Sequence, residues 1–160
     1  MEFSQLFEMQ KQLDRYIEET QNIQHDVFDE KGLALLVELG ELANETRCFK
    51  FWSTKGPSER NVILEEFVDS IHFMLSLGYM RDFKLDEWPV VMEKVDLTKC
   101  FITATQTVLT FLQHQTEESY KDIWTQYSLI AYNLGFTVED IIEAYKLKNE
   151  KNYERQRNGY

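Results

Sequence analysis

Two short acidic motifs carry the residues of this sequence that are best suited to chemistry. Glu38 and Glu41 lie three positions apart, and Glu66 and Asp69 repeat that spacing further along the chain. Residues three apart share one face of a helix, so each motif predicts two carboxylates that point the same way. Large apolar residues border both pairs, which sets them apart from an ordinary solvated face. If two such helices pack together, four carboxylates converge and repel one another until they are protonated or bind a cation.

The ligand type of this acidic cluster indicates which metal it would hold. Carboxylate oxygens favour Mg²⁺ or Mn²⁺ over zinc or copper. Asp69 and His72 also match half of the carboxylate-x-x-His signature of di-iron bundles, but that signature needs two helices and occurs here once. Cys48 and Cys100 stand apart and indicate neither a zinc site nor a disulfide. Without a metal, the alternative is that these acidic residues only solvate two helices.

Composition indicates what kind of element must position these residues. The chain has 160 residues, a formal charge of −11, and 43% hydrophobic and 14% aromatic residues. Such a chain can bury one core, and its acidity argues against binding a nucleic-acid backbone. Six glycines and two prolines leave few tight turns, which favours an all-α fold. No apolar run approaches the ~20 residues that cross a bilayer and no secretion signal is evident, so we expect a cytoplasmic protein without a membrane partner.

Apolar periodicity predicts a single domain over residues 1–160, folded as a bundle of five or six helices. The expected helices cover residues 3–20, 30–50, 58–80, 97–115 and 118–134, and a last one that begins after Thr137. Residues 86–96 are expected to connect two of them. The apolar side of the second helix is expected to comprise Leu33, Leu36, Val37, Gly40 and Ala43.

The end of the chain carries cations that complement the acidic motifs. Lys148, Asn152 and Arg155 fall at i, i+4 and i+7, which places them on one face of a helix. Their side chains are suited to donate hydrogen bonds to phosphate oxygens, and an arginine can bind two oxygens at once. The alternative is a solvated basic helix end that the helix dipole stabilises.

These motifs together resemble a known family. Glu-x-x-Glu followed by Glu-x-x-Asp is similar to the metal motif of the all-α nucleoside triphosphate pyrophosphatases. Within that superfamily, residues 69–73 and 148–160 resemble the Asp-x-x-His-Phe and Lys-Asn-x-x-Asn-x-x-Arg-Gln-x-x-Gly-Tyr signatures of the dimeric dUTPases. Residues 9–14 are similar to their Gln-rich first helix, except that Asp14 stands where many relatives carry an amide.

The resemblance implies Mg²⁺-dependent hydrolysis of dUTP to dUMP and pyrophosphate by a homodimer. It implies that the four acidic residues hold the metal, and Glu38 is our candidate for the base that takes a proton from the attacking water. The expected nucleotide-binding residues are Gln10, Lys50, Trp52, His72, Phe73, Lys148, Asn152, Arg155 and Tyr160. The apolar residues of 101–112 are expected to contribute to a dimer interface as well as to the core.

Two other functions remain open from the sequence. A pyrophosphatase of the MazG or dCTP type would share the metal motif and act on another nucleoside triphosphate. A non-catalytic helical module would use its acidic stripe to bind a basic partner. His72, Phe73 and the tail motif favour dUTP over the substrates of the MazG- and dCTP-type enzymes.

Overall fold

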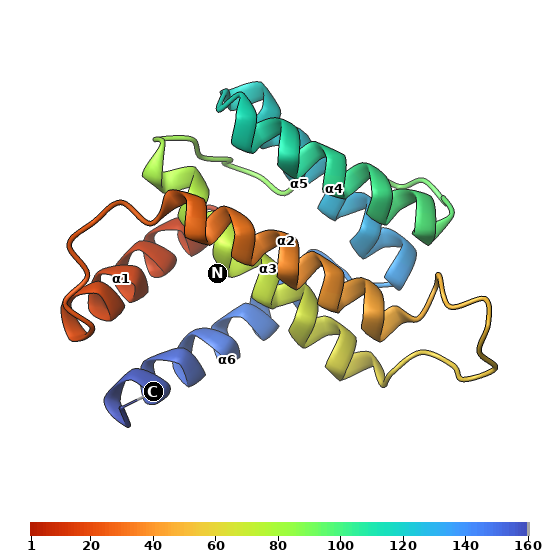
Figure 1. Ribbon diagram of the computed structural model, residues 1–160, viewed down its shortest axis with the longest axis horizontal. Helices are drawn as coiled ribbons and strands as arrows, with labels where there is room; N and C mark the ends of the chain where they lie inside the picture. The colour runs from red at the N-terminus through yellow and green to blue at the C-terminus, as the bar shows by residue number, and fades with distance from the viewer. Residues whose placement is uncertain (160) are drawn as a thin grey trace.

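Helices account for all the regular structure in residues 1–159, which are the residues that the computed structural model describes. The helices are α1 (Gln5–Thr20), α2 (Phe28–Thr46), α3 (Arg60–Met80), α4 (Leu97–Gln113), α5 (Glu117–Leu134) and α6 (Val138–Arg157) (Figure 1). The all-α prediction is therefore confirmed, with the expected helices displaced by only a few residues at their ends. None of the helices in this range is long and apolar enough to span a membrane.

Helix α3 is the central element of the bundle. It packs against α2, α6 and α1, while α4 pairs with α5 and also contacts α2 (Figure 1). Its buried residues lie on almost every side of the helix, as expected for a helix that other elements surround. Near its end, a Cβ at Gly78 would lie 2.1 Å from the hydroxyl of Tyr120, which donates to the carbonyl of Met74 at 2.6 Å. Glycine therefore leaves room for the side chain of Tyr120 against α3.

Local signals in the sequence define where α6 begins. Gly135 adopts a left-handed φ of 77° and ends α5, as its residue type predicts. Thr137 and Asp140 form a capping box, because each side chain accepts a hydrogen bond from the backbone N–H of the other. Arg60, the first residue of α3, pairs with Asp140 at 3.0 Å. These contacts align α6 with α3, along which the tail motif then runs.

The apolar side of α2 expected from the sequence is only partly buried, because Leu36 and Ala43 pack against the core while its other residues are exposed. Leu33 and Val37 are 63% and 52% exposed, and Gly40 is exposed as well. The residues of α2 that are buried are Phe28, Gly32, Leu35, Leu39, Leu42 and Thr46. Helix α2 carries apolar residues on two sides, and the positions of α3 and α4 decide which side is covered.

The apolar residues of α4 divide between the core and the surface. Ile102 and Leu109 are 66% and 38% exposed on the helix that packs beside α2. The buried residues of this helix include Phe101, Ala104, Val108 and Phe111. Exposed apolar side chains thus occur on both α2 and α4.

Candidate active site

Three carboxylates from α2 and α3 converge on one point. Glu38 of α2 and Glu66 and Asp69 of α3 each offer an oxygen, and these oxygens lie within 4.8 Å of one another. The two helices run in opposite directions and pack along their length, so that both acidic motifs meet (Figure 1). Glu41, one turn beyond Glu38, is exposed, but it lies close enough to Glu38 and Glu66 to affect both.

Burial and mutual repulsion disfavour the charged form of this cluster. Burial, the hydrogen bond to Glu41 and the charge of Asp69 raise the pKa of Glu38 to about 8. Burial and the charges of Asp69 and Glu41 raise the pKa of Glu66 to about 7. One oxygen each of Glu38 and Glu66 is buried and finds no hydrogen-bond partner among the residues described. Crowded carboxylates with orphaned acceptor oxygens fit a bound divalent cation.

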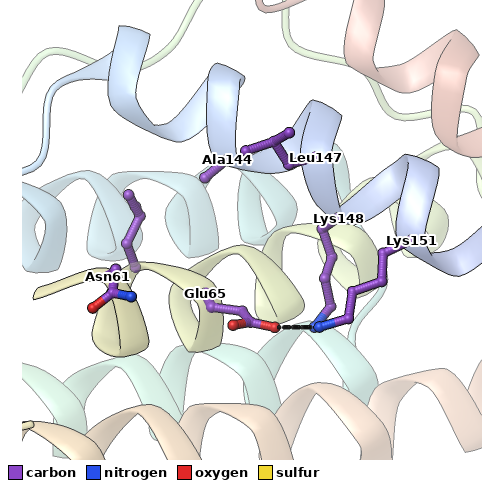
Figure 2. A pocket seen from close by; sticks show the side chains of 7 residues that line it. Asn61, Glu65, Ala144, Leu147, Lys148 and Lys151 are labelled. Carbon is purple, nitrogen blue, oxygen red and sulfur yellow. Dashed lines mark hydrogen bonds and ion pairs between the residues drawn. The ribbon is translucent and has the colours of Figure 1, made fainter. Parts of the chain in front are cut away.

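Lys148 of α6 brings a positive charge to this cluster. Its Nζ lies 2.9 Å from Asp69 Oδ1 and 2.9 Å from Glu65 Oε1, and 9% of its side chain is exposed. Glu65 also pairs with Lys151 at 3.3 Å. These three residues help to line a cavity of about 290 Å³ between α3 and α6, and Figure 2 shows Glu65 pointing toward both lysines. Burial lowers the pKa of Lys148, but its hydrogen bonds to Glu65 and Asp69 outweigh that effect, so the net shift is upward and Lys148 is charged.

A second cavity, of about 270 Å³, connects the acidic cluster with the other predicted segments. Residues of α1, α2, α3 and α6 form its walls. They are Gln10, Leu13, Asp14, Ile17, Glu38, Asp69, His72, Phe73, Ser76, Lys148, Asn152 and Arg155. The predicted nucleotide-binding residues of α1, α3 and α6 therefore share one cavity with two of the predicted metal ligands. We call this the active-site cavity.

Some predicted site residues lie elsewhere. Lys50 and Trp52 belong to the loop of residues 47–59 between α2 and α3, and neither lines the active-site cavity. Trp52 is 65% exposed and contacts the rings of Phe49 and Phe51. A contact of Lys50 or Trp52 with a nucleotide stays a prediction. Tyr160 lies outside the described residues.

A buried hydrogen-bond chain holds His72. Its Nδ1 lies 2.6 Å from Oε1 of Gln10, which also accepts from the hydroxyl of Tyr145 at 2.8 Å. The imidazole stacks on Tyr145 with 4.4 Å between ring centroids. Burial, and then the charge of Lys148, lower the pKa of His72 to about 3, so the ring is neutral. Its Nε2 is buried without a hydrogen-bond partner in the part of the chain that the structure describes.

Glu65 and Tyr145 are neighbours of the site that the sequence analysis did not single out. Glu65 precedes Asp69 by four positions, and this helical spacing places the two residues side by side. The spacing alone could therefore have indicated that Glu65 lies near the site. For Tyr145, the sequence indicated a place near the site only through its position three residues before Lys148. Its hydrogen bond to Gln10 of α1 joins residues 135 positions apart, which local spacing does not indicate.

Glu38→Gln is expected to stabilise the metal-free protein at about pH 8. The folded-state pKa of Glu38 is raised above 4.5, so its contribution to stability is complete below about pH 4.5 and is lost as the pH rises through about 8. Glutamine does not ionise, so the variant should unfold at a higher temperature than the wild type at high pH in EDTA. The difference should close toward about pH 5, where Glu38 is protonated.

Thermal unfolding across this pH range measures the effect. Glu93→Gln is the matched control, because Glu93 is exposed in the connector of residues 81–96 and should leave the pH profile of the wild type unchanged. Equal profiles for Glu38→Gln and the wild type would show that burial and neighbouring charges do not raise the pKa of Glu38 in the folded protein.

Comparison with known proteins identifies the family. The family model described as dUTPase matches residues 2–160. A search of curated proteins finds no match. The matched range contains both acidic motifs, the cavity residues of α1 and the tail motif. Membership implies a divalent metal, which the orphaned oxygens of Glu38 and Glu66 fit. The chain therefore belongs to the all-α dUTPase family, and its activity is that of a dUTP diphosphatase.

Proposed function

We propose that the enzyme hydrolyses dUTP to dUMP and pyrophosphate with Mg²⁺ held by Glu38, Glu41, Glu66 and Asp69. One observation carries this proposal: the carboxylates of Glu38, Glu66 and Asp69 converge, and two of them line a cavity that is also lined by cations and by His72. Their hard oxygens suit Mg²⁺, and Mn²⁺ shares that preference. The metal would supply positive charge against the triphosphate and lower the pKa of a water molecule.

Glu38 is the proposed general base for the attacking water. Burial and neighbouring charges raise its pKa to about 8, which supports this role because a carboxylate with a raised pKa is a stronger base than an exposed glutamate. A bound cation would lower that pKa, so that Glu38 is ionised and can accept a proton near neutral pH. Neither cysteine lines the active-site cavity, and His72 is held by Gln10. These positions favour direct attack by water over a covalent intermediate.

Two cations and an asparagine of α6 are the proposed phosphate ligands. Lys148, Asn152 and Arg155 line the active-site cavity from one face of α6. In the ligand-free protein, Lys148 pairs with Asp69. When metal and substrate bind, Asp69 would pair with the metal ion and Lys148 with a phosphate oxygen. Two new ion pairs would thus replace the one between Asp69 and Lys148, and neither charge would be buried alone.

The uracil ring is proposed to lie against His72, Phe73 and Gln10. Phe73 is half-buried and lines the cavity, so it offers an apolar surface to a base. His72 is neutral, and its Nε2, which has no hydrogen-bond partner within residues 1–159, can bind a polar edge. The base and the phosphates would then contact opposite parts of one cavity, with the acidic cluster beside the phosphates.

A homodimer is proposed to form through α2 and α4. Monomeric proteins rarely expose a large contiguous apolar patch, and Leu33, Val37, Ile102 and Leu109 are exposed on two helices that pack against each other. Covering these side chains with a second copy would remove them from water.

A substrate panel tests the proposed reaction. With Mg²⁺, the enzyme should hydrolyse dUTP with a kcat/KM at least about 100-fold above that for dCTP, because mismatched hydrogen bonds in a polar pocket discriminate that strongly. Pyrophosphate release from dUTP, dCTP, dTTP and UTP measures this. Preference for dCTP would instead assign the related dCTP-type activity. Absence of turnover on all four with Mg²⁺ or Mn²⁺ would contradict catalysis by this site.

Arg155→Ala tests the phosphate contacts. It should weaken binding of a non-hydrolysable dUTP analogue by about 10- to 150-fold, the value of a lost charged hydrogen bond, and should affect dUMP much less. Calorimetric titration of both ligands measures the two affinities. Arg157→Ala is the matched control, since Arg157 is exposed and absent from the cavity wall. Equal losses for the analogue and dUMP would contradict the assignment of Arg155 to the triphosphate.

Val37→Lys tests the proposed dimer. A buried, unpaired lysine in an interface is costly, so the variant should sediment as a monomer where the wild type has twice the chain mass of 19.1 kDa. Met92→Lys is the control, because Met92 is 75% exposed in the connector and lies on neither α2 nor α4. A wild type that sediments as a monomer at micromolar concentration, or an intact Val37→Lys dimer, would place the interface elsewhere or remove it.

A further inference from the structure

Asp14 is a buried carboxylate in the wall of the active-site cavity to which the proposed reaction assigns no role. Its side chain is 8% exposed. Its Oδ2 accepts from Lys31 Nζ at 3.0 Å, from the hydroxyl of Tyr79 at 2.7 Å and from the hydroxyl of Ser76. Its Oδ1 accepts from Nε2 of Gln10 at 2.9 Å. Every hydrogen bond of this carboxylate is one that it accepts.

Asp14 thereby decides which way the amide of Gln10 points. Because a carboxylate paired with lysine can only accept, Gln10 must turn its NH₂ group toward Asp14. Its Oε1 then faces Nδ1 of His72 and the hydroxyl of Tyr145. A carbonyl oxygen can only accept, so both of these partners must donate to it.

The same logic fixes the tautomer of His72. A neutral imidazole has one N–H, and Gln10 requires that proton on Nδ1. Nε2 therefore carries a lone pair and is an acceptor. It is buried in the cavity wall without a partner among the described residues, and a buried acceptor of this kind needs a donor.

We propose that Asp14 is a positioning residue for base specificity: through Gln10 it holds His72 as an acceptor for the N3–H of uracil. This inference rests on the proposed placement of the base against His72. Uracil carries a hydrogen on N3, whereas N3 of cytosine is itself an acceptor and would repel Nε2. Since Nε2 is covered in the ligand-free protein, a lining side chain must shift as the base enters.

Asp14→Asn is expected to reverse the polarity of this chain of hydrogen bonds. Lys31, Ser76 and Tyr79 all donate, so they would draw the amide oxygen of the new side chain. The NH₂ group of the new asparagine would then face Gln10. The amide of Gln10 would have to rotate so that its oxygen accepts from this NH₂ group. Gln10 would donate to His72 Nδ1, and the histidine proton would move to Nε2.

Nuclear magnetic resonance of ¹⁵N-histidine in the ligand-free, full-length protein measures the tautomer directly. His72 should be protonated on Nδ1 in the wild type and on Nε2 in Asp14→Asn. The other two histidines are exposed and can be assigned from His25→Gln and His114→Gln. Tyr79→Phe is the matched control, because it removes one donor to Asp14 but leaves the direction of Gln10 unchanged. An Nε2–H tautomer in the wild type would overturn the proposal even if Asp14→Asn fails to fold.

Substrate selectivity supplies the second measurement. Asp14→Asn should lower the kcat/KM ratio of dUTP to dCTP by about 10- to 100-fold, and Tyr79→Phe should preserve that ratio. The ratio of dUTP to dTTP should stay unchanged in Asp14→Asn, because thymine shares the N3–H of uracil. A tautomer that does not respond to Asp14→Asn would overturn the positioning role. A tautomer that responds while the dUTP to dCTP ratio stays constant would instead refute the placement of uracil at His72.

Discussion

The repulsion among the carboxylates of Glu38, Glu66 and Asp69 is the constraint on which the rest of the structure depends. Their oxygens lie within 4.8 Å of one another although each is half-buried. The packing of α2 on α3 must oppose this repulsion. Residues such as Leu35 and Phe67 are fully buried between the helices of the bundle, and each large apolar side chain contributes about 1.5–3 kcal/mol when it leaves water. The core thus holds together three carboxyl groups that disfavour one another's charged form.

Helix α6 supplies the charge that the cluster lacks. Its start is determined by Gly135 and by the capping box of Thr137 and Asp140, and the ion pair of Asp140 with Arg60 joins it to the start of α3. Lys148 of α6 thus reaches Asp69 and Glu65 of α3. The proposed metal ligands are thus negatively charged and the proposed phosphate ligands include two cations, with the ion pair of Asp69 and Lys148 between the two sets.

The two ends of the active-site cavity rely on different interactions. At the acidic end, net charge dominates, and the raised pKa values of Glu38 and Glu66 record the cost of removing carboxylates from water. At the end near His72, the groups are neutral and oriented, since burial keeps the imidazole uncharged and Gln10 orders its proton. Charge can bind any triphosphate, whereas oriented donors and acceptors can distinguish one base from another.

The sequence by itself determined the features that depend on residues close together in the chain. Helical spacing paired Glu38 with Glu41 and Glu66 with Asp69, and it placed Lys148 and Arg155 on one face. Only the tertiary structure decided which apolar side of α2 is covered, because that side depends on where α3 and α4 lie. It also decided that Gln10 and Asp14 reach His72 and Ser76, 62 positions away. Such contacts arise from packing between helices, which the periodicity of a single helix does not encode.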